Sequence, residues 1–371
     1  MNDKLVHRGP DADGFWHDAE RGVYLGHRRL AIVDITGGHQ PMWTQDRQLG
    51  VIFNGEIYNH QELRTELKGM GYVFESDHSD TEVLLHGYRA WGVDLPNHLN
   101  GMWAFALYDV AGRRLFCSRD RFGKKPFFYS HAGGAFVFAS ELSAVLQHPC
   151  APRSQSRTAL RKYFAYGYIP APHSLIEGIS KLPGGHSLLY DIPGEKFKVW
   201  KYWDFVLEPF EHTPNNAEEV WSEELRSLLD KAVQRRLMSD VPLGAFLSGG
   251  IDSSAVAAFA VRHIGQDRLK TFSIGFEEAS FDESRYARNV AEHLGTEHHA
   301  NILSMEKARA LLQARQLPEA KSILEQVCRA DPRDAEAWYL CGAVNHESGA
   351  LAEAETCYRQ AVALQPERPE A

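Results

Sequence analysis

Residues 51–59, with the sequence VIFNGEIYN, decide how the first part of the chain is interpreted. The apolar start of this stretch has the length and composition of a buried strand. Two interpretations of the next two residues are open, because Asn54-Gly55 is also a favoured two-residue hairpin turn. In the other interpretation, the Asn54 side-chain amide and the Gly55 backbone N–H are a pair of donors for a negatively charged oxygen. Glycine at position 55 would let a substrate approach the backbone closely.

Short apolar runs separated by turn residues continue through residues 1–205, for example at 103–108 and 135–139. Runs of this length are typical of buried strands. Helical patterns lie between them at 60–70 and 80–91. This mixture predicts sheets covered by helices.

Five segments of this region resemble, in the same order, the glutaminase domain of class II amidotransferases in the asparagine synthetase branch. They are HRGPD (7–11), HRRLAIVD (27–34), NGEIYN (54–59), SDTE (79–82) and RDRFGKKP (119–126). The resemblance implies an αββα sandwich of the N-terminal-nucleophile type over residues 1–205. It also implies a glutamine pocket formed by Arg29, Asn54, Gly55, Glu56 and Asp80.

The side chains of this pocket suit the chemistry of free glutamine. The planar fork of Arg29 matches the α-carboxylate, and Asp80 suits the α-ammonium group. Asn54 and Gly55 would supply the oxyanion donors when the amide is attacked. The alternative is a surface ion pair between Arg29 and Asp80 beside a simple hairpin turn, but the order of the motifs favours the pocket.

The resemblance also implies a cysteine nucleophile at the mature N-terminus, with its own α-amino group as the base. Residue 2 is instead Asn2, and the first cysteine, Cys117, lies inside an expected strand at 114–118. We interpret Cys117 as a small core residue. We therefore expect a glutaminase domain that is truncated at its N-terminus, lacks its first strand, and keeps no catalytic group other than the donors Asn54 and Gly55.

Residues 208–216 resemble a linker, with two prolines and two asparagines. Helical patterns then occupy 218–237, 254–263 and 283–294, and strand patterns occupy 241–247 and 269–276. This alternation predicts a parallel α/β sheet over residues 214–303.

A glycine- and serine-rich loop, SGGIDSS at residues 248–254, comes after the first of these strands and opens a helix. Backbone N–H groups in such a turn converge on phosphate oxygens, and the three serines add hydroxyl donors. Asp252 suits a magnesium ion that bridges phosphates. The alternative is a serine-rich helix cap.

The loop resembles the pyrophosphate loop of ATP pyrophosphatases and lacks the Walker A pattern. The resemblance implies ATP binding with Mg²⁺ on Asp252 and an adenine between Leu247 and Ile274. The implied ATP-binding residues are Leu247, Ser248, Gly249, Gly250, Asp252, Ser253, Ser254 and Ile274. The segments 281–284 and 294–299 also match this family.

Two further features of this region limit the interpretation. His298 and His299 would point to opposite faces of a strand, so they predict no metal site. The family's second acidic segment does not occur in the sequence. We expect residues 214–303 to be a partial synthetase domain.

Residues 304–371 have a helical pattern that repeats every 34 residues. Leu317-x-Glu319-Ala320 recurs as Leu351-x-Glu353-Ala354, and Pro332 recurs as Pro366. The period and the anchor residues resemble two tetratricopeptide repeats. The alternative is an ordinary helical hairpin.

Composition excludes several classes of protein. The net charge of −9 disfavours generic nucleic-acid binding. No apolar run reaches the roughly 18 residues of a spanning helix, and the first residues do not resemble a signal peptide. The five scattered cysteines predict reduced thiols rather than a disulfide framework. We therefore expect a cytoplasmic protein that binds neither nucleic acid nor membranes.

Together these patterns predict an asparagine synthetase family member whose substrates are glutamine, aspartate and ATP. The implied reaction amidates aspartate with ammonia from glutamine and releases AMP and pyrophosphate. We expect little activity from this chain itself. The alternative is a non-catalytic scaffold that binds glutamine and ATP while its helical tail binds a protein partner or a second copy.

Overall fold

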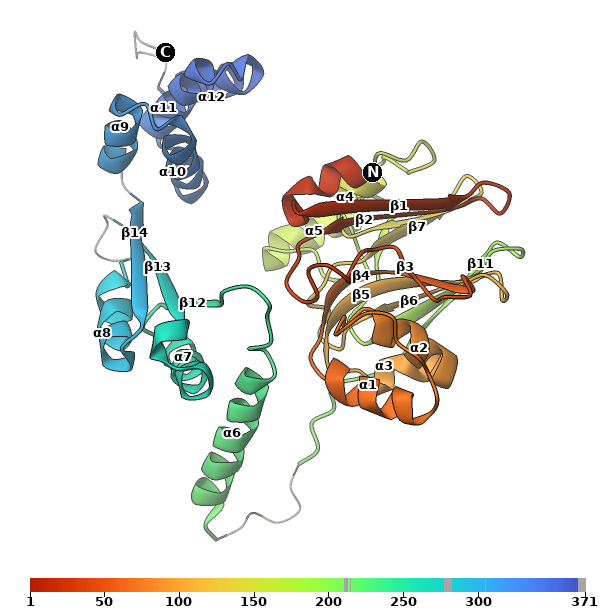
Figure 1. The fold of residues 1–371 in the computed structure, drawn as a ribbon. Helices are drawn as coiled ribbons and strands as arrows, with labels where there is room; N and C mark the ends of the chain where they lie inside the picture. Colours follow the sequence, from red (N-terminus) through yellow and green to blue (C-terminus); the bar gives the residue numbers. More distant parts are fainter. Residues whose placement is uncertain (210–212, 214, 277–281, 304, 366–371) are drawn as a thin grey trace. The chain divides into compact units, whose positions relative to one another are not determined.

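The computed structural model describes residues 1–209, 213, 215–276, 282–303 and 305–365 (Figure 1). These residues form two compact units. One contains Met1–Ser222 with Met238–Val241, and the other contains Glu223–Leu237 with Pro242–Ala371. Within the described part, no helix combines the length and the apolar character needed to cross a membrane.

The centre of the first unit is a six-stranded antiparallel sheet in the order β11-β10-β6-β5-β4-β3. Helices α1, α2 and α3 cover one face of this sheet (Figure 1). Two smaller sheets, β1-β2 and β8-β7-β9, face its other side, and α4 packs on β7 and β8. These layers agree with the predicted αββα sandwich, whereas the lack of a first strand stays a prediction.

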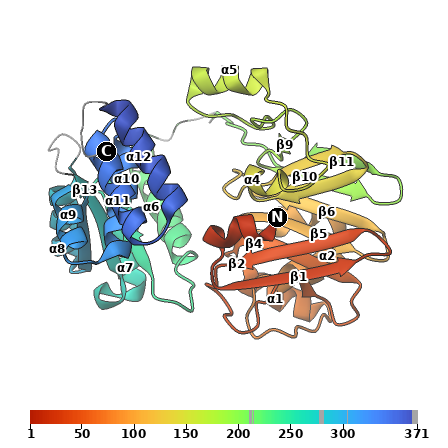
Figure 2. The same ribbon diagram turned by 90° about the horizontal axis from the view of Figure 1, so that it is seen from above.

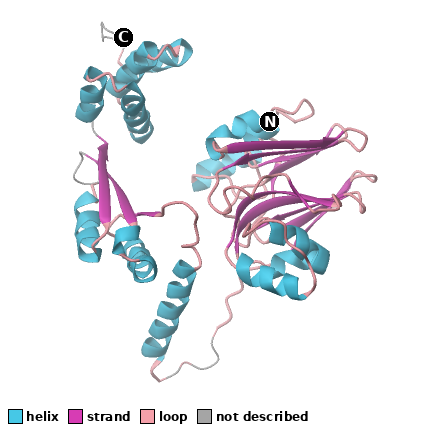
Figure 3. Cartoon of the chain, viewed as in Figure 1, coloured by secondary structure: helices cyan, strands magenta, loops and turns pink. Residues whose placement is uncertain are grey.

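The first unit is built of short strands and helices (Figure 3), and the most buried of the strands are β5 and β6 in the centre of the large sheet. The strands are β1 (Ala12–Asp18), β2 (Val23–Arg29), β3 (Met42–Trp43), β4 (Leu49–Ile57), β5 (Gly101–Asp109), β6 (Arg114–Arg119), β7 (Phe128–Ala132), β8 (Ala135–Ala139), β9 (Ser180–Lys181), β10 (His186–Asp191) and β11 (Lys196–Lys201). The helices are η1 (Asn2–Arg8), α1 (His60–Gly69), α2 (Glu82–Trp91), η2 (Gly92–Asp94), α3 (Leu95–His98), α4 (Leu142–Val145) and α5 (Arg157–Tyr166).

Strand β5 is buried on both faces because its side chains alternate between two cores. Trp103, Phe105 and Leu107 belong to the core beneath α1–α3. Ala104, Ala106 and Tyr108 belong to the core between the sheet layers. Such a strand is a rigid base for its neighbour β4, which contains the Asn54-Gly55 pair.

The second unit begins within α6 (Ala217–Gln234) and contains the parallel sheet β12-β13-β14. Its elements are β12 (Gly244–Phe246), α7 (Ile251–Ile264), η3 (Gln266–Arg268), β13 (Lys270–Phe276), α8 (Ser284–Leu294) and β14 (Glu297–Leu303). The predicted strand at 241–247 is shorter than expected. The reason is that the Val241 backbone N–H and C=O are both bonded to the Ser239 hydroxyl. Part of the predicted linker at 208–216 lies outside the described residues.

Four consecutive helices complete this unit (Figure 2). They are α9 (Met305–Gln313), α10 (Leu317–Ala330), α11 (Ala335–Glu347) and α12 (Leu351–Leu364). Helices α10 and α12 begin 34 residues apart, as the repeat predicts. Gly342 is the close-contact point of α11 and α12, because a Cβ there would lie 2.7 Å from the Tyr358 ring. Pro366 lies outside the described residues.

Candidate active site

Asn54 and Gly55 lie inside β4, where they pair with Ala104 and Trp103 of β5. The hairpin-turn interpretation is therefore wrong. Gly55 is required by the sheet itself, since an added Cβ would lie 2.1 Å from the Met102 carbonyl oxygen. Both residues are held in one place by the β4–β5 ladder.

The Asn54 side chain offers an unused donor. Its Nδ2 is buried and has no hydrogen-bond partner among the described residues. A buried amide group without a partner is costly and unusual in proteins. Together with its place on a rigid strand, this makes Asn54 a preorganised donor for an oxygen that arrives with a ligand.

Asp80 lies just before α2 and is 6% exposed. Its Oδ2 accepts a hydrogen bond from the Ile57 backbone N–H at 3.0 Å, which joins it to the end of β4. Burial raises the pKa of Asp80, while the Ile57 hydrogen bond and the charge of His60 act in the opposite direction. A buried carboxylate of this kind favours a cationic partner.

Arg29, at the end of β2, is 7% exposed and holds the turn after that strand. Its guanidinium donates hydrogen bonds to the carbonyl oxygens of Ile35 (2.8 Å), Val33 (3.1 Å) and Asp34 (2.6 Å). Arg29 and Asp80 are both buried with other partners, so the surface-ion-pair interpretation is wrong. Glu56, also on β4, is half-buried.

Two residues that the sequence did not single out hold Phe53, the residue before Asn54. Nε2 of His27 lies 3.0 Å from the Phe53 carbonyl oxygen. Burial lowers the pKa of His27 to about 4, so its ring is neutral near pH 7. The Gln40 side chain accepts from the Phe53 N–H at 2.6 Å and donates to the Thr81 hydroxyl at 3.4 Å. His27 lies inside one of the family segments, whereas Gln40 has no signal in the sequence.

Asp240 also has no signal in the sequence, and it joins two loops of the first unit. Its carboxylate accepts a hydrogen bond from the Asp34 backbone N–H at 2.7 Å and lies 2.7 Å from Nε2 of His78. Its own N–H donates to the Ile32 carbonyl at 3.0 Å. These bonds connect the turn held by Arg29 to the loop that leads into Asp80.

Residues 119–126 form a loop in which the side chains of Arg119 and Asp120 bind backbone groups of the protein itself. The Asp120 carboxylate, 1% exposed, accepts backbone hydrogen bonds from Trp103, Phe122, Lys124 and Lys125. Arg119 donates to three backbone carbonyls, those of Gly123, Lys125 and Leu182.

Cys117 is a core residue on β6, as predicted. It is fully buried in the core between the sheet layers. Burial raises the pKa of the Cys117 thiol well above its usual range, so its thiolate is scarce near neutral pH.

The loop 248–254 lies between β12 and α7, where the sequence predicts a phosphate cradle. The Ser248 and Ser253 hydroxyls lie 3.0 Å apart, and Ser248 Oγ accepts from the Gly250 N–H at 3.3 Å. The N-cap residue of α7 is Gly250, and it makes no side-chain cap hydrogen bond. The Ser253 and Ser254 hydroxyls both donate to the Gly250 carbonyl, so the loop serines bond the backbone at the start of α7. They are not seen to accept from the first-turn N–H groups, which stay available to another partner, and the phosphate cradle stays a prediction.

Gly249 is essential to this turn. It has a φ of +79°, and an added Cβ would lie 2.4 Å from Cβ of Tyr286 on α8. Asp252 lies in the first turn of α7 and is exposed. Its carboxylate oxygens are of the type that Mg²⁺ prefers.

Leu247 and Ile274 lie toward the same edge of the parallel sheet. Leu247 comes directly after β12, is 2% exposed, and donates its N–H to the Phe272 carbonyl at 2.8 Å. Ile274 lies near the end of β13 and is 46% exposed. Asp282 caps α8 through Ser284, while Phe281 lies outside the described residues.

The neighbouring histidines of β14 have separate surroundings, as predicted. His298 lies within 3.1 Å of the hydroxyls of Thr271 and Ser273. His299 pairs with Glu297 at 2.8 Å. Across the described ranges, no group of three or more His, Cys, Asp or Glu side chains is placed to hold a metal ion.

Comparison with protein families gives two matches along the chain. The family model of the glutamine amidotransferase domain matches residues 1–203. The family model of asparagine synthase matches residues 224–351, which includes α9, α10 and α11.

Several curated proteins are similar over most of the chain. Asparagine synthetase [glutamine-hydrolyzing] 3 of Bacillus subtilis is 41% identical over 320 residues, covering 82% of this chain and 51% of that protein. A putative asparagine synthetase of Methanocaldococcus jannaschii is 37% identical, covering 81% of this chain and 60% of that protein. The asparagine synthetase of Zea mays is 34% identical, covering 81% of this chain and 46% of that protein. The chain thus spans about half the length of the curated relatives it matches.

Among solved structures, the match to the allosteric regulatory enzyme of purine biosynthesis covers 75% of this chain and 66% of that enzyme's chain. The sequence identity is 16% and the TM-score is 0.37. A glutamine phosphoribosylpyrophosphate amidotransferase from Bacillus subtilis gives a TM-score of 0.35. Similarity at this level carries no conclusion about the site.

Proposed function

The chain belongs to the family of glutamine-hydrolysing asparagine synthetases, and we propose that its first unit binds free glutamine and its second unit binds ATP. In the reaction that family membership implies, ammonia from glutamine amidates the side-chain carboxylate of aspartate while ATP is converted to AMP and pyrophosphate. The observation that carries the glutamine proposal is the buried, unpartnered amide nitrogen of Asn54 on the rigid strand β4.

Each end of glutamine has a counterpart in the first unit. The Asp80 carboxylate would pair with the α-ammonium group. Arg29 makes three hydrogen bonds to backbone carbonyls, which leaves part of its five-donor capacity for the α-carboxylate. Asn54 Nδ2 and the Gly55 N–H would receive the side-chain amide oxygen, and Glu56 lies beside them on β4.

Calorimetric titration with glutamine tests this proposal. Asp80→Asn keeps the size of the side chain and the acceptor for the Ile57 N–H but removes the charge. A charge-assisted hydrogen bond contributes about 1.5–3 kcal/mol, so glutamine affinity should fall by at least about tenfold. Asp13→Asn, at an exposed position on β1, is the matched control. Equal affinities for the two variants would contradict the proposal.

The ATP proposal is supported by the uncapped start of α7 and by the tight Gly249 turn. The loop serines and the first-turn N–H groups would hold the phosphates, and Asp252 would hold Mg²⁺ between phosphate oxygens. Titration with ATP should give weaker binding for Asp252→Asn than for the native chain when Mg²⁺ is present. In excess EDTA the two should bind ATP equally. Asp267→Asn, exposed in η3, should match the native chain in both conditions.

Turnover by this 371-residue polypeptide should be low. Neither cysteine of the first unit suits a nucleophile at β4, because Cys117 is buried with a raised pKa and Cys150 contacts Gly133 beside the β7–β8 hairpin. Glutamate release should therefore stay far below a typical enzymatic rate of about 10 per second. A faster rate that persists in Cys117→Ala would contradict this proposal.

The division of the chain into a glutaminase region (1–205), a partial synthetase region (214–303) and a repeat tail (304–371) is also part of this proposal. The repeat character of the tail is supported by the 34-residue offset of α10 and α12. The match to the asparagine synthase family model runs past residue 303 and ends at residue 351, so it overlaps the region that we assign to the tail.

A further inference from the structure

A chain of hydrogen bonds joins strand β4 to the carboxylate of Asp80 through the side chain of Gln40. The side-chain carbonyl oxygen of Gln40 accepts from the Phe53 backbone N–H at 2.6 Å, and its amide nitrogen donates to the Thr81 hydroxyl at 3.4 Å. Burial raises the pKa of Asp80, and a hydrogen bond with the Thr81 side chain is among the interactions that oppose this rise. A hydroxyl can accept one hydrogen bond and donate another, so the connection runs from Phe53 to Asp80 without a break.

This connection and the direct bond from Ile57 to Asp80 bracket the proposed oxyanion donors. Phe53 and Ile57 lie on either side of the segment 54–56. The Ile57 N–H donates to the Asp80 carboxylate at 3.0 Å, and Phe53 is joined to the same carboxylate through Gln40. The segment 54–56 is thus tied to Asp80 at both of its ends, and the two ties set the distance between the donors and the carboxylate.

The β3–β4 register places Gln40 where it can act as a spacer. Strand β3 pairs with the first half of β4, and Gln40 continues the same register to Phe53 with its side chain instead of its backbone. The backbone of Gln40 is in close contact with β1, because an added Cβ at Gly14 would lie 1.7 Å from the Gln40 carbonyl oxygen. The spacer therefore starts from a backbone position that has little room to move.

The length of the spacer matters because glutamine and asparagine differ by one methylene group. Both amino acids carry the same α-ammonium group and the same side-chain amide. A pocket that holds both of these groups at once distinguishes the two amino acids by the distance between its two sets of partners. One methylene group typically changes the preference of a pocket by roughly 10- to 200-fold.

We propose that Gln40 is a positioning residue that makes the pocket selective for glutamine over asparagine. It acts through the distance between Asn54 and Asp80 rather than through a bond of its own to the amino acid. Loss of the spacer leaves the Ile57 bond as the remaining tie, so the distance varies and the shorter amino acid is accommodated more easily. This inference rests on the proposed glutamine-binding function of the first unit.

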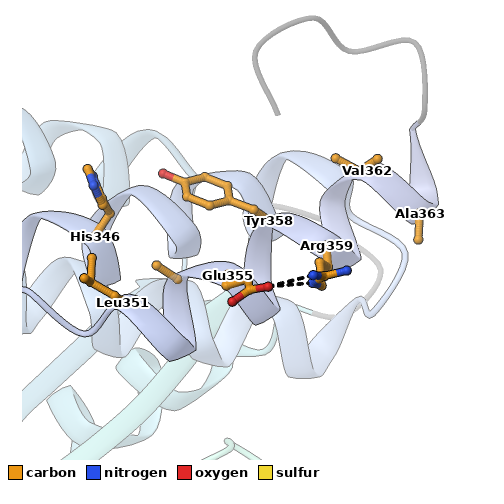
Figure 4. A pocket seen from close by; sticks show the side chains of 8 residues that line it. His346, Leu351, Glu355, Tyr358, Arg359, Val362 and Ala363 are labelled. Carbon is orange, nitrogen blue, oxygen red and sulfur yellow. Dashed lines mark hydrogen bonds and ion pairs between the residues drawn. The ribbon is translucent and has the colours of Figure 1, made fainter.

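The open groove on the outer face of α12 does not offer the same chemistry (Figure 4). Its volume is about 620 Å³, and its lining includes the apolar side chains of Leu351 and Val362. Glu355, the carboxylate of this lining, pairs with Arg359 at an N–O distance of 2.7 Å. The groove therefore presents no unpaired carboxylate to the ammonium group of a free amino acid.

Calorimetric titrations of the full chain with glutamine and with asparagine test the proposal, and the quantity compared is the ratio of the two dissociation constants. The native chain should prefer glutamine by about tenfold or more. Gln40→Met keeps the length of the side chain and removes both hydrogen bonds, and it should lower this preference by at least about fivefold. Thr81→Val breaks the connection but leaves the Phe53 N–H its acceptor, and it should lower the preference in the same way. Thr81→Ser restores the hydroxyl and should restore the preference.

Ser130→Ala is the matched control for the loss of a buried hydrogen bond. The Ser130 hydroxyl, 3% exposed, donates to the Gly178 carbonyl at 2.8 Å, away from the proposed pocket. This variant should have a lower melting temperature and the native preference for glutamine. A preference that falls as far in Ser130→Ala as in Gln40→Met would show that general loss of stability is the cause, and it would overturn the proposal.

The other outcomes separate the inference from the function on which it rests. A native preference in Gln40→Met or Thr81→Val, with glutamine still bound, would overturn the inference alone. Equal weakening of both amino acids in Thr81→Val would show a purely structural role and would also overturn it. If Gln40→Met does not fold, the comparison of Thr81→Val with Thr81→Ser decides. Absence of glutamine binding by the native chain would overturn the proposed function and the inference together.

Discussion

The carboxylate of Asp80 accepts the backbone hydrogen bond of Ile57 at 3.0 Å, although the two residues are 23 positions apart in the sequence. Ile57 ends β4, the strand that contains Asn54 and Gly55. The bond therefore fixes the proposed ammonium-binding carboxylate relative to the proposed oxyanion donors.

Glutamine binding should depend on pH through Asp80. Burial raises the pKa of this carboxyl, and only its ionised form attracts an ammonium group. Affinity should therefore fall as the pH drops through the raised pKa, which is at a higher pH than for an ordinary aspartate. Calorimetric titrations at a series of pH values check this. An affinity that stays constant until the ordinary aspartate pKa is reached would contradict it.

The carboxylate of Asp80 should also lower the free energy of unfolding at neutral pH. Because the folded-state pKa of Asp80 is raised, its contribution to stability is complete below the unfolded-state pKa and is lost as the pH rises through the folded-state pKa. Asp80→Asn should therefore raise the free energy of unfolding at pH 7 more than at acidic pH. Urea unfolding at both pH values measures the difference, with Asp13→Asn as the control. A variant less stable than the native chain at pH 7 would show that the carboxylate stabilises the fold.

His78 should titrate above the usual range because of Asp240. Hydrogen bonds with Asp240, and then with Asp77, raise the pKa of His78. The contribution of this contact to stability is complete below the unfolded-state pKa of histidine and is lost as the pH rises through the raised pKa. In an NMR titration, Asp240→Asn should lower the His78 pKa more than Asp77→Asn does. If both substitutions lower the pKa of His78 equally, Asp240 is not the main cause of the raised pKa.

The phosphate loop should tolerate no side chain at position 249. Gly249 and Gly265 have similar φ values, +79° and +83°, but a Cβ at Gly265 meets open space. Gly265 has a ψ of +155°, so its backbone lies in a region that only glycine occupies readily, and Gly265→Ala should cost about 1–3 kcal/mol for the backbone alone. Gly249→Ala adds a clash with Tyr286 and should be less stable and lose ATP binding. Thermal unfolding and ATP titration of both variants check this, and equal stability of the two would contradict it.

Local patterns in the sequence predicted most of the elements. The run at 135–139 coincides with β8, and the helix expected at 60–70 is α1, His60–Gly69. Apolar runs and helical periodicity are properties of neighbouring residues, so one sequence is enough to find them. The same holds for the alternation of β12, α7, β13 and α8.

Contacts between distant residues could not be predicted in this way. Gln40 bridges Phe53 and Thr81, and Asp240 bonds to the turn after β2, without any local signal. Residue type suggested that Arg29 binds a carboxylate, whereas the structure shows it holding three backbone carbonyls. The choice between hairpin turn and strand at Asn54-Gly55 depended on pairing with β5, more than forty residues later in the sequence.

The side-chain amide resonance of Asn54 tests the central claim most directly. In ¹⁵N-labelled protein this resonance is identified by its loss in Asn54→Ala. Saturating glutamine should shift its amide proton downfield, because the unpartnered Nδ2 gains an acceptor. Norvaline, whose unbranched apolar side chain offers no oxygen acceptor at that place, should shift it less. If glutamine binds, as shown by calorimetry, and the Asn54 amide resonance does not move, glutamine lies elsewhere and the proposed pocket is wrong.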